Sequence, residues 1–118
     1  PAITMLTVTN SGTIAYLFDQ YNGNNPTVYV ISGTTIAFDL NVPGHPFLIQ
    51  DGAGDDYTNG LVHVSNNGTV STGAAANGQT SGVLYWKVPF GISGNYRYQC
   101  SAHAIMVGAI AIKSFNAI

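Results

Sequence analysis

The sequence predicts an all-β protein, a single-domain antiparallel sandwich or barrel of about eight short strands. Two observations lead to this prediction. Nowhere in the 118 residues do apolar side chains recur at helical spacing over three turns. Short runs rich in β-branched and aromatic residues recur throughout instead, and Gly, Asn, Pro and Asp bound each run, as is typical of strands joined by turns. The length is that of one domain, which we place at residues 1–118.

The expected strands follow one another closely along the chain. They are residues 3–9, 13–18, 27–31, 34–40, 47–50, 60–64, 83–88, 94–100 and 109–115. Residues 27–31 form a nearly continuous apolar run, so we expect that strand to be covered on both faces. In residues 34–40 the alternation directs Ile36, Phe38 and Leu40 toward the core.

The composition excludes several classes of protein. Charged residues make up only 7% of the chain, which carries three Lys and Arg and a net charge of −2. Intrinsic disorder needs more charge and less hydrophobicity than this, and three cations cannot neutralise a run of phosphates, so we expect no nucleic-acid partner. One cysteine allows no internal disulfide. No apolar run reaches eighteen residues, so we expect no membrane span. The chain starts at Pro1 without a basic and apolar leader, which fits a mature periplasmic or otherwise extracytoplasmic protein, or a trimmed chain.

Two other places in the sequence carry possible metal ligands, and one further segment is expected to be a loop. Residues 51–59 contain Asp51, Asp55 and Asp56, and clustered carboxylates could bind calcium. Their spacing fits no EF-hand, and we interpret the segment as a solvated loop. His63 could be a metal ligand, although we favour a half-exposed histidine on a strand. Residues 71–82, rich in Gly, Ala, Thr and Asn, are expected to be a surface loop.

The strongest motif brings together three side chains with soft or borderline donor atoms. Cys100, His103 and Met106 are separated by two residues each, and alternation along residues 94–100 directs the Cys100 sulfur inward. Thiolate and thioether suit Cu(I), imidazole suits Cu(II), and two His, one Cys and a weak Met form electron-transfer copper sites. A second imidazole is available in the proline-flanked segment Gly44-His45-Pro46-Phe47. The alternative is a buried cysteine that packs as a small apolar residue beside an unrelated histidine.

These residues resemble the cupredoxin family, the small blue copper proteins. The similarity covers Tyr16-Leu17-Phe18, Gly44-His45-Pro46-Phe47, Trp86 to Pro89 and residues 96–112. The two-residue gaps on both sides of His103 are most similar to the amicyanin and pseudoazurin type. The resemblance implies a Greek-key fold and one copper ion that carries one electron.

The resemblance also assigns roles to individual residues. It implies that His45, Cys100 and His103 are the equatorial ligands and that Met106 is the axial ligand. Many family members have Asn directly after the first ligand histidine, where it helps to tie the two ligand loops together. Pro46 occupies that position here, so the tie must be weaker or come from elsewhere.

The family further implies how electrons reach the site. The edge of His103 is expected to emerge within an apolar patch formed by Pro46, Ala102, Ala104 and Ile105, where a redox partner docks transiently on a monomer. Small, weak interfaces are typical of such encounters. Two alternatives stay open at this point: a copper carrier or storage module, and a sandwich domain with a structural or binding role. A catalyst is not expected, because copper oxidases and nitrite reductases need further histidines and only His63 remains.

Overall fold

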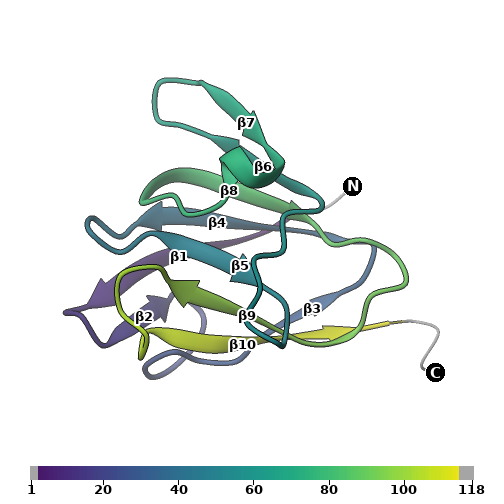
Figure 1. Cartoon of the computed structure of the whole chain (residues 1–118), viewed down its shortest axis with the longest axis horizontal. Coiled ribbons are helices and arrows are strands. Elements are labelled where there is room, and N and C mark those ends of the chain that lie inside the picture. The colour runs from purple at the N-terminus through teal and green to yellow at the C-terminus, as the bar shows by residue number, and fades with distance from the viewer. Residues whose placement is uncertain (1–2, 115–118) are drawn as a thin grey trace.

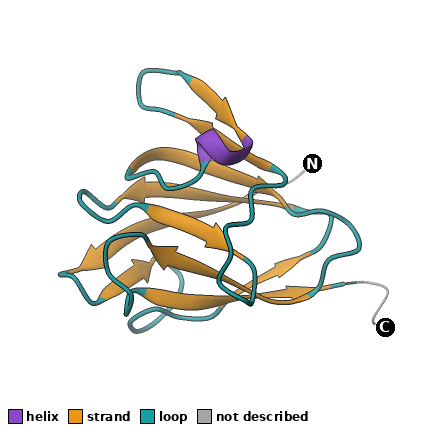
Figure 2. Ribbon diagram, viewed as in Figure 1, coloured by secondary structure: helices purple, strands orange, loops and turns teal. Residues whose placement is uncertain are grey.

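The structure, a computed structural model, describes residues 3–114. They form ten strands and one short 3-10 helix, η1, in the arrangement shown in Figures 1 and 2. The strands are β1 (Ile3–Ser11), β2 (Ala15–Phe18), β3 (Val28–Ile31), β4 (Thr35–Asn41), β5 (Phe47–Gln50), β6 (Leu61–Val64), β7 (Val70–Thr72), β8 (Ser81–Lys87), β9 (Gly94–Cys100) and β10 (Val107–Lys113), and η1 spans Gly73–Ala76. The predicted all-β sandwich is confirmed. The end of the predicted last strand, at Phe115, lies outside the described residues.

The strands form two sheets that face each other. One sheet has the order β2-β1-β4-β8-β6-β7, and the other has the order β3-β10-β9-β5. Most neighbours pair in an antiparallel manner, but β1 pairs with β4 and β10 pairs with β3 in parallel. The chain crosses from one sheet to the other between β2 and β3, at each connection from β3 to β6, and between β8 and β9. The two sheets therefore enclose one shared core. Within residues 3–114 no helix has the length and hydrophobicity of a membrane span.

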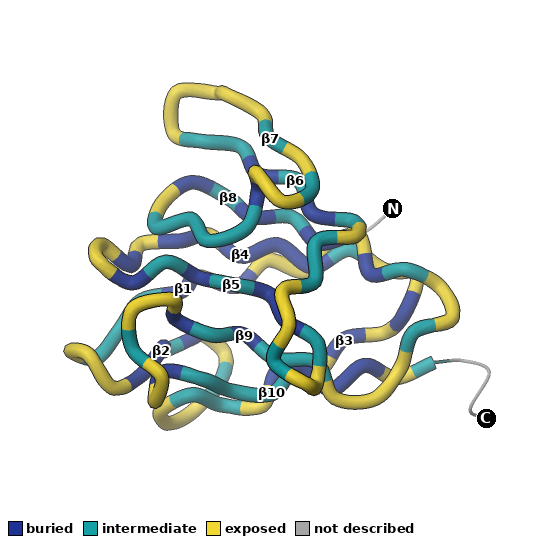
Figure 3. The backbone as a smooth tube through the Cα atoms, in the orientation of Figure 1, coloured by how far each residue is buried: buried dark blue, intermediate teal, exposed yellow. Residues whose placement is uncertain are grey.

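The core is built by the alternation that the sequence predicts. Ile36, Phe38 and Leu40 of β4 are buried, as are Leu84 and Trp86 of β8. Figure 3 shows this alternation of buried and more exposed positions along the strands. Five rings from four strands pack against one another at the centre of the sandwich, most of them edge to face: Tyr16, Phe18, Phe38, Phe47 and Tyr98. This aromatic cluster fixes the spacing between the two sheets.

Two expectations about burial are wrong. The run at β3 is covered on one face only: Val28 and Val30 are buried, whereas Tyr29 and Ile31 leave 61% and 40% of their surfaces exposed. An apolar run cannot distinguish a strand covered on both faces from one whose outer face is bare. His63 is not half-exposed but buried. Its Nε2 lies 2.7 Å from the Ser81 carbonyl oxygen.

His63 is buried because the segment after it is not the surface loop that the sequence predicts. Residues 71–82, expected to be a surface loop, contain the end of β7, η1 and the start of β8. β7 pairs with β6, and η1 contacts β6. This segment therefore encloses the surroundings of β6, and its last part meets His63 directly through the Ser81 carbonyl. Its small Gly and Ala residues gave no strand signal, because strand formation here depends on pairing rather than on propensity.

Candidate metal centre

Two connections at the same end of the sandwich supply the candidate ligands. One is the turn between β4 and β5, and the other is the loop between β9 and β10 (Figure 1). Strand pairing accounts for their proximity, because Phe47, two residues after His45, lies opposite Cys100 in the β5–β9 pair. The backbone N–H of Ser101 also donates to the Pro46 carbonyl across the two connections, at 3.1 Å.

The turn that carries His45 has the geometry its sequence dictates. The N–H of His45 donates to the carbonyl of Val42 at 2.9 Å, and Gly44 has a φ of 81°. Pro43 and Gly44 thus occupy the two central positions of a type II turn, where proline presets the first φ and glycine tolerates the positive second one. The turn directs His45 back into the protein, where only 8% of its surface remains exposed.

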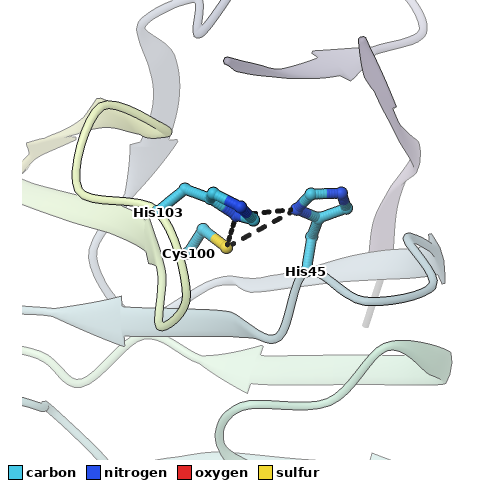
Figure 4. Close-up of side chains that lie close together, drawn as sticks. All are labelled: His45, Cys100 and His103. Carbon is cyan, nitrogen blue, oxygen red and sulfur yellow. Dashed lines mark hydrogen bonds between the residues drawn. The ribbon is translucent and has the colours of Figure 1, made fainter. Parts of the chain in front are cut away.

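Three donor atoms converge at this end of the sandwich. The Cys100 Sγ lies 3.8 Å from His45 Nδ1 and 3.6 Å from His103 Nδ1, and the two Nδ1 atoms are 3.2 Å apart. Figure 4 shows both rings turned toward the sulfur and toward each other. Within residues 3–114, this is the single group of three His, Cys, Asp or Glu side chains whose donor atoms gather closely enough to hold a metal ion.

These separations fit a metal ion. Metal–sulfur and metal–nitrogen bonds of about 2.3 and 2.0 Å, at angles between tetrahedral and trigonal, place donors about 3.3 to 3.8 Å apart. The three distances fall within or close to this range. One thiol and two imidazoles are also the donor types that soft and borderline transition metals prefer. The donor set therefore fits one ion without a large movement of the backbone.

Met106 lies at the end of the loop and is fully buried. Its N–H donates to the His103 carbonyl at 3.1 Å, and its own carbonyl accepts from the Cys100 N–H at 2.9 Å. These two bonds fold the loop back on itself and hold Met106 next to the two other loop residues. The other candidates lie elsewhere. His63 is outside the cluster, and the carboxylates of Asp51 and Asp56 accept hydrogen bonds within their own region of the chain.

Known structures share this architecture. Rusticyanin from Thiobacillus ferrooxidans superimposes with a TM-score of 0.54 over 94% of this chain and 77% of its own, at 18% identity. A mutant of amicyanin, in its reduced Cu(I) form, gives a TM-score of 0.50 over 92% of this chain and 82% of its own, at 14% identity. This is a cupredoxin fold. Neither a family model nor the sequence of a curated protein matches the chain.

The cupredoxin fold also occurs within larger proteins. A Cu-containing nitrite reductase from Thermus scotoductus matches with a TM-score of 0.57 at 16% identity over 94% of this chain, which corresponds to only 30% of the reductase. At such identities the likeness establishes the fold alone. What this cupredoxin fold does must be argued from its own residues.

The backbone bond from Ser101 to Pro46 ties the two ligand loops together, and the His45 turn is also fastened by a residue whose role the sequence did not reveal. Pro46 stands where many cupredoxins have Asn, and the buried hydroxyl of Tyr16 lies 2.7 Å from the His45 carbonyl and 3.1 Å from that of Pro46. Burial, and to a smaller degree the Cys100 sulfur, raises the pKa of Tyr16 well above its usual range. The hydroxyl therefore stays protonated and remains a donor. The sequence placed Tyr16 in a family-like strand but gave no sign of this bond.

Replacing Tyr16 with Phe is expected to lower the free energy of unfolding by about 1 to 3 kcal/mol, because a buried carbonyl loses its donor. Tyr29→Phe is the matched control, since this ring is largely exposed, and it should change stability by less than about 0.5 kcal/mol. Urea unfolding of both variants measures the difference. Equal stabilities for the two variants would show that the Tyr16 hydroxyl does not fasten the His45 turn.

Proposed function

We propose that this protein is an electron carrier that holds one copper ion between His45, Cys100, His103 and Met106. The convergence of the three nearest donor atoms, all within 4.8 Å of one another, is the observation that carries the proposal. When bound, copper supplies one-electron chemistry by alternating between Cu(I) and Cu(II). His45, Cys100 and His103 would be the strong ligands and Met106 the weak one.

The chain contributes rigidity to this chemistry. The donors belong to two short connections whose ends are fixed in paired strands, and His45 sits in a turn restricted by proline. The Cys100 Sγ also accepts a hydrogen bond from the Ala102 N–H at 3.4 Å, which orients the sulfur. A site that keeps its shape when its charge changes suits rapid electron transfer, because little has to reorganise.

The surface around the site supports transfer to a partner. His103 is half-buried, whereas His45 is almost wholly buried. Ala102, Ala104 and Ile105 are exposed around His103, and Ile105 leaves 64% of its surface open. We include in the proposal that a redox partner docks here on a monomer. A location outside the cytoplasm also belongs to the proposal and rests on the resemblance to cupredoxins.

The structural likeness to a nitrite reductase does not lead us to propose a catalytic function for this chain. The part of the chain that the structure describes gathers one set of donors, and the third histidine, His63, is engaged with Ser81 elsewhere. In the proposed electron carrier, every donor atom of this cluster binds the copper ion, and we assign no residue to the activation of a substrate.

Titration of the metal-free protein with Cu(II) tests the proposal. We expect an intense sulfur-to-copper absorption band in the visible region that saturates at one equivalent. Cys100→Ala should abolish the band, because the charge-transfer donor is lost. His63→Gln is the matched control and should retain it. Absence of the band in the wild type, or its persistence in Cys100→Ala, would refute the proposed site.

Voltammetry and chelation separate the electron carrier from a metal-delivery protein. An electron carrier should give a reversible one-electron wave and release copper slowly to a competing chelator. A copper carrier should lose its metal rapidly, and that result would overturn the assignment of electron transfer while leaving the metal site intact.

A further inference from the structure

Gln99 reaches the metal loop from its outer side. It precedes Cys100 on β9, so the alternation of the strand directs its side chain away from the core while the Cys100 sulfur points inward. The side chain is half-buried. Its Nε2 lies 2.9 Å from the carbonyl oxygen of Cys100, 3.1 Å from that of His103, 3.3 Å from that of Ala104 and 3.2 Å from that of Met106. The loop backbone thus folds around a single amide nitrogen.

The convergence of these four carbonyl oxygens is electrostatically unfavourable without a hydrogen-bond donor between them. Four carbonyl oxygens turn their negative ends toward one point, and they would repel one another if nothing stood between them. A primary amide nitrogen offers only two hydrogens, so the four acceptors must share them. Three of the four carbonyls belong to the residues that the proposed function assigns as ligands, namely Cys100, His103 and Met106. The position of Gln99 is therefore coupled to the backbone of the ligand residues.

We propose that Gln99 is a positioning residue that holds the metal loop closed by capturing these carbonyls. The amide keeps the loop in its ligand-presenting shape without a metal ion, and it thereby slows the escape of a bound ion. The first part concerns the metal-free protein alone. The second part rests on the proposed function.

Charge at position 99 distinguishes this role from simple space filling. Gln99→Glu is nearly isosteric, but it places carboxylate oxygens against four carbonyl oxygens. Gln99→Lys carries three donors and a positive charge, so it should satisfy the carbonyls at least as well as the amide. Gln99→Met removes the donors without adding charge. A side chain that merely filled space would tolerate all three changes equally.

Amide hydrogen exchange of the metal-free protein at pH 8 measures the opening of the loop. The reporters are the N–H groups of Cys100 and Met106, which close the loop through their bonds to Met106 and His103. We expect exchange about tenfold faster in Gln99→Glu, a smaller increase in Gln99→Met, and rates within about threefold of the wild type in Gln99→Lys. Gln79→Glu is the matched control, since the Gln79 Nε2 makes one such bond, to the Ala75 carbonyl. It should leave the loop unchanged.

The N–H of Ile110, in the β10–β9 pair, reports whether each variant is folded. If Gln99→Glu does not fold, the comparison of Gln99→Met with Gln99→Lys decides. Wild-type exchange rates in Gln99→Glu, or equal opening in the Lys and Met variants, would overturn the inference.

Metal release provides a second readout. In copper-loaded protein, transfer to a chelator should be about tenfold faster in Gln99→Glu than in the wild type and nearly unchanged in Gln99→Lys. Failure of the wild type to bind copper would refute the proposed function, but the exchange experiment would still test Gln99. Faster exchange with unchanged metal release would confine the role of Gln99 to the metal-free protein and overturn the second part of the inference.

Discussion

Copper in thousandfold excess over its dissociation constant is expected to raise the free energy of unfolding by about 4 kcal/mol. The folded protein holds three donors within 4.8 Å of one another, whereas the unfolded chain separates His45 from Cys100 by 55 positions. A metal ion therefore binds the folded state far better and shifts the equilibrium toward it. Thermal unfolding of the protein with Cu(I), in the absence of oxygen so that the thiol stays reduced, measures the effect as a rise in Tm.

The same experiment identifies the ligands. Cys100→Ala should lose most of the stabilisation, since it removes the thiolate, which is the softest donor of the set. His63→Gln should keep it, because His63 lies outside the cluster. A Tm that does not depend on the concentration of free copper would contradict a site preformed by folding.

Replacing Phe47 with Ala is expected to cost about 3 to 5 kcal/mol of stability. Phe47 is completely buried, and its ring centroid lies 5.1 Å from those of both Tyr16 and Phe38 and 5.7 Å from that of Tyr98. Removal of the ring leaves a cavity in the middle of the aromatic cluster, and rings held by pairing in different strands cannot collapse to fill it. Urea unfolding measures the loss.

Phe90→Ala is the control for this substitution, because 82% of the Phe90 surface is exposed. It should change stability by less than about 0.5 kcal/mol. We also expect Phe47→Ala to weaken copper binding, since Phe47 pairs with Cys100 and follows His45 by two residues. A loss of less than about 1 kcal/mol in Phe47→Ala would show that the cluster does not join the two sheets as described.

The sequence predicted the class of fold well because alternation is a local property. Residues such as Phe38, Trp86 and Tyr98 are buried where a period of two places them. Local patterns carry less information about what covers a strand. The outer face of β3 and the burial of His63 depend on segments that are distant in sequence or lack strand propensity, and both were predicted wrongly for that reason.

The sequence also predicted one part of the candidate site and missed another. His45, Cys100 and His103 could be selected because their donor atoms have distinctive chemistry, and the structure brings these three side chains together. The residues that hold them in place could not be selected. Tyr16 and Gln99 act through hydrogen bonds to backbone carbonyls, and nothing in a tyrosine or a glutamine taken alone indicates which carbonyl it will meet. Such partners emerge only from the register of the folded strands.

The position of β10 has a consequence for the order in which the molecule assembles. β10 lies between β3 and β9, and Ile110 sits opposite Val28, roughly eighty positions earlier in the chain. Folds dominated by such distant pairings form slowly, on a scale of about milliseconds to seconds. The hairpin that carries Cys100 is held in its sheet on one side by this long-range contact. The thiol of a nascent chain therefore stays open to oxidation until β10 has docked, and early supply of the metal would protect it.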